Sequence, residues 1–446
     1  MPFVSTRSPQ ANPVTLAEAV QRGLAPDGGL YVPASIPAMP PEAFEALRGA
    51  TLPDVATSLI GPLVGDTFST EALGRLVASA LDFPVPLVPL SPGLSILELF
   101  HGPTLAFKDV GARTMARWLA AVTDAGDRRP LTVLVATSGD TGGAVAQAFH
   151  GVAGTRVVVL YPRGRVSPVQ EAQFTTLGGN VTAVAVEGAF DDCQRLVKEA
   201  FADPAIAGAL RLTSANSINI GRLLPQMAYY AWAVLQLPAG SLPPTIVVPS
   251  GNLGNLTAGV MAMRRGVPIG GFVVATTTAN DPLPRYLATG RYEPRSSTAT
   301  LASAMDVGAP SNFERLVYLF GGDVTAARAV MTSATVSDDD IRGAIRDLSD
   351  RWGYVADPHS AVGYLGARAA QRDHTAPIVF MATAHPAKFR EVVEPALGRT
   401  VPLPASLADR LAQPPQVVAA GPTLTSLAGV LATLDSSPAT GNISAP

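Results

Sequence analysis

Lys108 is the residue of this chain whose type and surroundings could do the most chemistry. It ends the run Phe100-His-Gly-Pro-Thr-Leu-Ala-Phe-Lys108, between a short apolar strand pattern over Leu94–Phe100 and a helical pattern over Gly111–Ala121. A lysine held in an apolar pocket at such a turn loses part of its ammonium character and can attack an aldehyde. The alternative is a surface lysine that happens to follow a phenylalanine.

Two polar loops could bind anions. The loop Thr137-Ser-Gly-Asp-Thr-Gly-Gly143 follows a strand pattern and opens a helix, so its N–H groups and the hydroxyls of Ser138 and Thr141 could hold a carboxylate or a phosphate. The loop Ser250-Gly-Asn-Leu-Gly-Asn255 resembles neither a nucleotide P-loop nor a dinucleotide fingerprint, and a phosphate without Mg²⁺ fits it better. Ordinary tight turns and capped helices are the structural alternatives.

Two further loops carry polar groups. In Asn216-Ser-Ile-Asn-Ile-Gly-Arg222, the guanidinium beside Ser and Asn donors would make a phosphate clamp, although a capped helix with a solvated arginine explains it equally well. In Met381-Ala-Thr-Ala-His-Pro-Ala-Lys-Phe389, Thr383 would point from a strand end into a crevice. His385, which precedes a proline, is interpreted as a helix cap.

Alternating strands and helices must position these loops. The candidate strands are Leu131–Ala136, Arg156–Tyr161, Val181–Val186, Thr245–Pro249, Gly271–Ala275 and Pro377–Met381. The candidate helices are Gly143–His150, Pro168–Leu177, Phe190–Ala202, Ile220–Leu235 and Asn255–Arg265. The strands are short and apolar on both faces, which predicts an α/β fold with two open, mostly parallel sheets wrapped by helices. Every polar loop then lies at the carboxyl end of a strand, where such folds bind ligands.

Composition shifts divide the chain into four predicted regions. An N-terminal domain covers residues 1–88, and the proline-rich stretch Phe83–Pro89 around its end is predicted to be a rigid connector. Two α/β domains follow, over residues 89–240 and 241–400. Residues 401–446 form a Pro- and Ala-rich tail, with one short helix at Leu424–Leu434 and a disordered end from Ser436.

Bulk composition excludes several classes of protein. The 446 residues are 47% hydrophobic and 15% charged, with a net charge of −3 and no basic stripe, so nucleic-acid and membrane partners are not expected. A single cysteine, Cys193, rules out an internal disulfide framework, and five scattered histidines lack metal-ligand spacing. No signal-peptide or membrane-span pattern is present, and we expect a cytoplasmic protein.

Several stretches of the chain, in order, match one family. They are Phe3–Arg7, Gly23–Pro33, Phe100–Asp109, Ala136–Gly142, Asn216–Arg222, Val248–Asn255, Ala304–Gly308, Pro310–Arg315 and Thr383–Phe389. With these motifs the chain resembles threonine synthase of the longer microbial and fungal type. That family belongs to the fold type II pyridoxal-phosphate enzymes, whose fold is like that of the tryptophan synthase β chain. Leu253 departs from a common phenylalanine, and the tail from residue 402 lies outside the match.

The resemblance implies a role for each loop. Lys108 would bond covalently to pyridoxal phosphate, and the backbone of Gly251, Asn252, Leu253 and Asn255 would cradle the cofactor phosphate. Thr383 would meet the pyridine nitrogen, and its neutral hydroxyl would leave that nitrogen largely unprotonated. The substrate α-carboxylate would bind Ser138, Gly139, Asp140 and Thr141. The substrate phosphate would bind Ser217, Asn219 and Arg222.

The implied reaction converts O-phospho-L-homoserine and water to L-threonine and phosphate. Lys108, once released from the cofactor, would act as general base at Cα and then move protons at Cβ and Cγ. The expected oligomeric state is a monomer or a homodimer. A serine/threonine dehydratase or a phosphothreonine lyase could use the same cofactor loops, but the second anion site near Arg222 favours the synthase. A catalytically inactive relative would not need Lys108.

Overall fold

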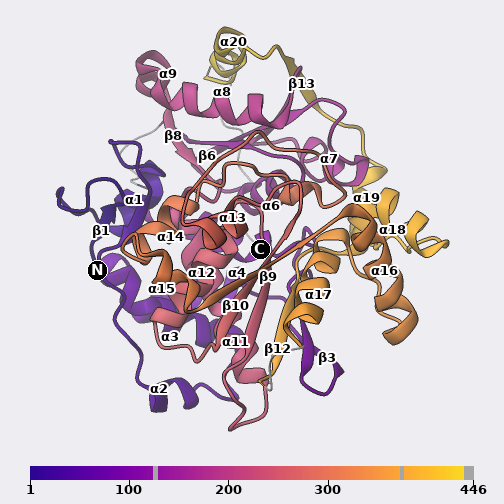
Figure 1. The fold of residues 1–446 in the computed structure, drawn as a ribbon. Helices are drawn as coiled ribbons and strands as arrows, with labels where there is room; N and C mark the ends of the chain where they lie inside the picture. Colours follow the sequence, from indigo (N-terminus) through magenta and orange to yellow (C-terminus); the bar gives the residue numbers. More distant parts are fainter. Residues whose placement is uncertain (124–128, 372–375, 436–446) are drawn as a thin grey trace.

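Two sheets of mostly parallel strands organise the chain in a computed structural model, which describes residues 1–123, 129–371 and 376–435 (Figure 1). The larger sheet runs in the order β11 (Met331–Val336), β10 (Gly271–Thr277), β9 (Thr245–Pro249), β12 (Ile378–Ala382), β4 (Leu94–Glu98) and β3 (Leu87–Ser91). The smaller sheet runs β13 (Val417–Ala420), β7 (Val181–Val186), β6 (Thr155–Pro162), β5 (Leu131–Ala136) and β8 (Arg211–Ser214). Only the β3–β4 pairing within these two sheets is antiparallel in the described residues. The predicted fold class is confirmed.

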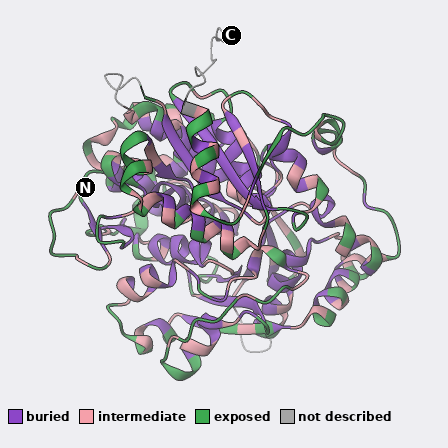
Figure 2. Ribbon diagram, turned by 90° about the horizontal axis from the view of Figure 1, so that it is seen from above, coloured by how far each residue is buried: buried purple, intermediate pink, exposed green. Residues whose placement is uncertain are grey.

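The strands are buried on both faces, as their unbroken apolar runs predict (Figure 2). Alternate residues of one strand enter different cores. In β9, Ile246 and Val248 face a central core, whereas Val247 packs into a separate core on the opposite face. In β5, Val133 and Val135 face the same central core, and Leu134 faces outward into a third one. The two sheets therefore share one helical layer between them.

Helices between the sheets carry most of the loops of interest. This central group contains α5 (Lys108–Val122), α6 (Asp140–Phe149), α7 (Pro168–Thr175), α10 (Ile220–Leu223), η2 (Leu224–Gln226), α11 (Met227–Gln236) and α12 (Gly254–Arg264). The predicted single helix over 220–235 is interrupted at η2, where Pro225 lacks an N–H donor. The helix after the turn begins at Lys108 itself, three residues before the predicted start.

Other helices cover the outer faces. The larger sheet is covered by α16 (Asp338–Trp352), α17 (Pro358–Ala370), η4 (Pro386–Phe389) and α18 (Arg390–Leu397). The smaller sheet is covered by α8 (Phe190–Ala202), α9 (Pro204–Ala209) and α20 (Leu424–Asp435). Between β10 and β11 the chain forms α13 (Pro282–Thr289), η3 (Ser303–Met305), α14 (Phe313–Leu319) and α15 (Val324–Arg328).

The N-terminal region packs against the central core. It consists of β1 (Phe3–Ser5), α1 (Leu16–Arg22), β2 (Tyr31–Pro33), α2 (Pro41–Glu45), α3 (Leu52–Val64), η1 (Gly65–Thr67) and α4 (Thr70–Ala80). Strands β1 and β2 pair antiparallel in a small separate sheet. Helix α3 begins with a capping box, because Thr51 and Asp54 each bond the other's backbone N–H.

Each of the two large sheets contains strands from more than one of the predicted domain ranges. The domain ranges themselves remain a prediction. The connector expected at Phe83–Pro89 runs into β3, and β3 and β4 join the sheet built from residues 245–382. In the tail, α19 (Ala405–Leu411) and β13 precede α20, and β13 pairs in parallel with β7. The predicted helix at 424–434 is confirmed, whereas the disorder predicted from Ser436 lies outside the described residues. Among the described helices, none is long and apolar enough to cross a membrane.

Candidate active site

The predicted loops line one cavity between the two sheets. Strand-end residues from both sheets meet there because β4, β5, β8, β9 and β12 all point their carboxyl ends toward it. The lining residues named from the sequence are Lys108, Ser138, Asp140, Thr141, Ser217, Arg222, Gly251, Asn252, Leu253, Asn255 and Thr383. Gly139 and Asn219 are the two predicted site residues that do not line it.

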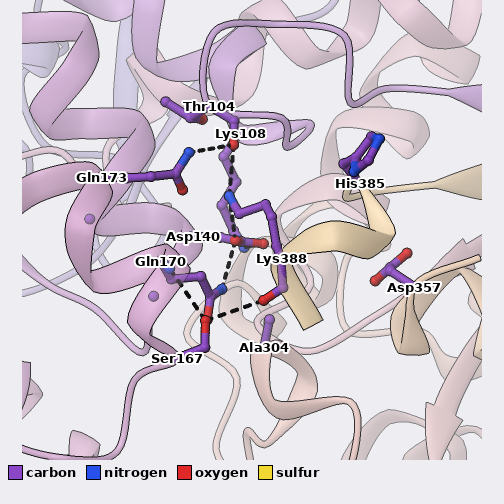
Figure 3. A network of polar contacts seen from close by, with 12 residues as sticks. Thr104, Lys108, Asp140, Ser167, Gln170, Gln173, Ala304, Asp357, His385 and Lys388 are labelled. Atoms are coloured by element: carbon purple, nitrogen blue, oxygen red, sulfur yellow. Dashed lines mark hydrogen bonds and ion pairs between the residues drawn. The ribbon is translucent and has the colours of Figure 1, made fainter. Parts of the chain in front are cut away.

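Lys108 lies at the first position of α5 and faces the start of α6. Its Nζ is 3.4 Å from Oδ2 of Asp140, whose other oxygen, Oδ1, is 2.8 Å from Nζ of Lys388 (Figure 3). The side-chain amide of Gln170 also donates to Oδ1 at 2.8 Å. The Asp140 carboxylate therefore lies between two lysines.

Burial and neighbouring charges set the protonation of this group. Burial lowers the pKa of Lys108, and the positive charges of Lys388 and Arg222 lower it further, against the attraction of Asp140. Burial alone would raise the pKa of Asp140, but Lys388 and Lys108 outweigh it and hold that pKa well below its ordinary value. The result is an ionised carboxylate beside an amine that loses its proton easily.

The loop before α6 is folded around one buried hydroxyl. The Oγ1 of Thr137 accepts from the N–H of Gly139 at 2.9 Å and of Gly142 at 2.8 Å. Gly139 has φ of +141°, and a Cβ there would lie 2.6 Å from the side chain of Gln170. Gly139 thus serves the turn, while Ser138 and Thr141 reach the cavity.

The start of α12 presents backbone N–H groups to the cavity. Leu253 caps this helix in the left-handed region, with φ of +61°, a conformation that costs about 1–2 kcal/mol for a residue with a Cβ. A Cβ on Gly251 would lie 2.8 Å from Cα of Met305, so glycine lets η3 approach this turn. The side chain of Asn255 accepts from the hydroxyls of Tyr229 at 2.6 Å and Tyr230 at 2.7 Å. Its Nδ2 donates to Sδ of Met381 at 3.3 Å, so both ends of the side-chain amide have protein partners.

Asn252 and Ser217 join two of the loops. Asn252 Nδ2 donates to Ser217 Oγ at 2.8 Å, and Asn312 Nδ2 donates to the same oxygen at 3.0 Å. Arg315, fully buried, donates to the Ser217 carbonyl at 2.9 Å. Ser217 Oγ accepts both amide bonds and keeps its own hydrogen to donate into the cavity.

Arg222 is the buried cation of the 216–222 loop. Its guanidinium donates to the carbonyl of Ala215, and its Nε has no hydrogen-bond partner among the described residues. Burial lowers its pKa to about 10, so it keeps its charge at neutral pH. Asn219, by contrast, is fully buried and holds α1, because its amide donates to the carbonyl of Val20 at 2.8 Å.

Thr383 is held by elements on both sides of it. Its N–H donates to Ser360 Oγ at 3.2 Å, and its carbonyl accepts from the N–H of Phe107 at 2.9 Å, next to Lys108. The predicted cap at His385 is confirmed, since its Nδ1 accepts from the N–H of Ala387 at 3.1 Å.

Sequence reasoning missed a histidine in the cavity wall. His359 Nδ1 lies 2.6 Å from Oδ2 of Asp357, and its Nε2 accepts from the N–H of Ala304 at 3.0 Å. These contacts imply a neutral ring with its proton on Nδ1. The local signal was the helix start Asp357-Pro-His, which is typical of a capped helix and indicates no site. Ala304–Val307 also lines the cavity, and no role was predicted for it.

The residues present fit pyridoxal phosphate. The cofactor needs an amine for its aldehyde and an anion site for its phosphate. Lys108, an amine whose pKa is lowered, and the N-terminal turn of α12, whose first N–H groups have no helical partners, face the same cavity. Thr383 lines it as a third group.

Comparison with known proteins gives the family. The family described as "Pyridoxal-phosphate dependent enzyme" matches residues 84–384, "Threonine synthase N terminus" matches residues 2–81, and "Threonine synthase, C-terminal" matches residues 360–427. The chain is 44% identical to the threonine synthase of Serratia marcescens over 402 residues, which cover 90% of this chain and 92% of the relative.

Solved structures agree with the sequence relatives. The crystal structure of threonine synthase from Escherichia coli aligns with a TM-score of 0.91 and 40% identity, covering 97% of this chain and all 100% of the other. The structure of PLP-bound threonine synthase from Brucella melitensis aligns with a TM-score of 0.90 and 38% identity, covering 98% of this chain and 100% of the other. The chain therefore belongs to the threonine synthase family of pyridoxal-phosphate-dependent enzymes.

Proposed function

We propose that the chain converts O-phospho-L-homoserine and water to L-threonine and phosphate, the last step of threonine biosynthesis. The observation that carries the proposal is one cavity lined by a reactive amine at Lys108, a helix N-terminus at α12 and a buried cation at Arg222. Those are the groups needed for an aldehyde, a cofactor phosphate and a second phosphate on the substrate.

Lys108, Thr383 and the turn from Gly251 to Asn255 would hold the cofactor. When bound, pyridoxal phosphate supplies the electron sink that stabilises the charge left at the substrate Cα. Lys108 takes the proton from Cα, moves one proton from Cβ to Cγ around the loss of phosphate, and returns a proton to Cα after the water oxygen bonds to Cβ, because its Nζ lies in the cavity and its pKa is lowered. The remaining proton of the water goes to the departing phosphate.

Two groups of residues would orient the substrate. Ser138 and Thr141, with the N–H groups at the start of α6, bind the α-carboxylate. The Asp140 carboxylate keeps its contacts with Lys108 and Lys388, and Gly139 allows the loop to turn. Arg222 and the Ser217 hydroxyl bind the leaving phosphate, and Asn219 supports their loop from behind.

A coupled assay tests the proposal. Purified enzyme loaded with cofactor is incubated with O-phospho-L-homoserine, and phosphate and threonine are measured together. We expect one phosphate for each threonine. Release of 2-oxobutyrate from threonine, without threonine formation, would indicate a dehydratase and contradict the proposal. We further expect a cytoplasmic monomer or homodimer without a nucleic-acid partner, and light scattering would measure the oligomeric state.

A further inference from the structure

Lysine is rare in this chain, and two of its lysines lie against the same carboxylate. Only 3 lysines occur among the 32 basic residues, at positions 108, 198 and 388. Lys198 is exposed on α8, whereas Lys108 and Lys388 contact the same carboxylate of Asp140. Arginine occupies nearly every basic position of the chain, whereas position 388, which is fully buried, has the more compact ammonium group of lysine.

The contacts around Asp140 separate the two lysines. Lys388 makes the shorter contact, 2.8 Å to Oδ1, and its Nζ also donates to the carbonyl of Thr104 at 2.7 Å. Lys108 makes one hydrogen-bond contact among the described residues, 3.4 Å to Oδ2, and its Nζ also lies 5.3 Å from the ring centroid of Phe107. Lys108 lines the cavity, and Lys388 does not. One buried carboxylate stabilises one buried ammonium group far better than two. These distances indicate that Lys388, rather than Lys108, forms the ion pair with Asp140.

We propose that Lys388 is a positioning residue, which binds the carboxylate of Asp140 as its ion pair and thereby leaves Lys108 as a free amine. Lys388 belongs to η4, after the last strand of the larger sheet, and Asp140 opens α6, after a strand of the smaller sheet. The pair therefore also connects the two halves of the site. Gln170, which donates to the same oxygen as Lys388, helps to hold the carboxylate in place.

The charged groups around Lys108 determine whether loss of Lys388 raises or lowers the pKa of Lys108. They are Asp140 on α6, Lys388 of η4 and Arg222 on α10, while Asp306 and His359 line the same cavity. Asp109, next along α5, is turned away and bonds Thr104. Without Lys388, the Asp140 charge would act on Lys108 alone, and a repulsive neighbour would be gone. Both changes raise the pKa of Lys108 and make its amine less available at neutral pH.

Competitive acetylation measures the pH at which the Lys108 amine loses its proton. The full chain, freed of cofactor, is treated with trace acetic anhydride over a pH series, and the acetylation of each lysine is measured by mass spectrometry of peptides. Exposed Lys198 serves as the internal standard in the same molecule. In Lys388→Met we expect the Lys108 midpoint to rise by about one pH unit or more, which is about tenfold less amine at a fixed pH below it. Lys388→Arg, which keeps the charge, should show less than half of that rise.

A double-mutant cycle tests whether Asp140 transmits the effect. Asp140→Asn alone should lower the Lys108 midpoint, since an attractive charge is lost while Lys388 and Arg222 remain. Adding Lys388→Met to Asp140→Asn should raise it by less than half of the rise seen in the wild-type background. This double variant removes both charges of the Lys388–Asp140 pair together, so it also serves if Lys388→Met alone does not fold.

Specific outcomes would overturn the proposal. An unchanged midpoint in Lys388→Met, with a native circular dichroism spectrum, would show a merely structural lysine. An equal rise in both backgrounds, or a midpoint that does not fall in Asp140→Asn, would remove Asp140 from the mechanism. The inference rests on the proposed role of Lys108, but acetylation requires neither cofactor nor substrate. Its failure would leave the threonine assay unaffected, and failure of that assay would not change the acetylation result.

Discussion

At the scale of single residues, the same side-chain type has different functions according to its contacts. Ser217 and Asn219 are two positions apart in one motif, yet Ser217 faces the cavity and Asn219 bonds the N-terminal helix α1. The predicted contact of Asp140 with the substrate stays a prediction, and in the structure its carboxylate contacts two lysines. A motif indicates which residues are needed at a site. Only the contacts of each residue show whether it can bind a ligand or instead supports the fold around the site.

Replacing Lys108 by alanine should abolish the covalent cofactor adduct and lower the turnover rate by roughly 10²–10⁴-fold or more, because nucleophile and proton carrier are lost together. Borohydride reduction followed by peptide mass spectrometry measures the adduct. Lys198→Ala, at an exposed position, is the control and should keep both adduct and activity. An adduct that persists on Lys388 in the Lys108→Ala variant would contradict the assignment.

Replacing Arg222 by methionine should weaken substrate binding more than cofactor binding. A hydrogen bond to a charged group contributes about 1.5–3 kcal/mol, which corresponds to a rise in KM of roughly tenfold to a hundredfold. Steady-state kinetics gives KM, and absorbance titration gives the cofactor Kd. If the cofactor Kd rises by the same factor and KM does not, Arg222 belongs to the cofactor site instead.

At the scale of elements, short turns at strand ends position the site by their backbone. Leu253 in the left-handed region and Gly139 at φ of +141° are backbone conformations that a sequence pattern does not specify. Helix α5 begins at Lys108 and α6 at Asp140, each three residues before the predicted start, so both residues lie on first helical turns. Strand β11 was missed because its polar run Met331-Thr-Ser-Ala-Thr-Val336 belongs to a sheet edge and has exposed positions.

Adding a methyl group at Gly251 should loosen the cofactor turn. The new Cβ would approach the backbone of Met305 to 2.8 Å, and such overpacking costs about 1–3 kcal/mol. We expect a cofactor Kd at least about tenfold higher in Gly251→Ala, measured by absorbance titration. The matched control is Gly343→Ala in α16, where nothing lies within 4 Å of the new Cβ. An unchanged Kd in Gly251→Ala would mean that η3 moves aside freely.

At the scale of the whole molecule, segments distant in sequence complete each sheet. The strand before Lys108 belongs to the sheet built after residue 240, and β13 belongs to the sheet built before it, so each of the two large sheets takes strands from both halves of the chain. The C-terminal strand β13 covers the edge of β7, and Leu427 and Leu431 of α20 are buried against the outer face of the smaller sheet.

Removing residues 405–446 should therefore destabilise the protein. Burial of each of the two leucines contributes about 1.5–3 kcal/mol, so we expect the free energy of unfolding to fall by at least about 3 kcal/mol. Urea denaturation followed by circular dichroism measures it. Deletion of residues 436–446 alone is the control and should leave the urea midpoint unchanged. Equal midpoints for the two deletions would show that α19, β13 and α20 contribute little.

The sequence by itself determined the fold class, most buried strands and the loops that reach the cavity. Apolar runs of five or six residues, such as Leu131–Ala136, form strands that are buried on both faces. Such strands can therefore be recognised from the sequence without knowledge of the tertiary structure. The tertiary structure decided which lysine is the free amine and which holds the ion pair. That depends on distances of 2.8 Å from Lys388 and 3.4 Å from Lys108 to one carboxylate. Lys388 lies more than 200 positions after Asp140 in the chain, whereas Lys108 precedes it by 32. Electrostatic coupling varies with distance and burial in space, and neither can be read from the order of residues along the chain.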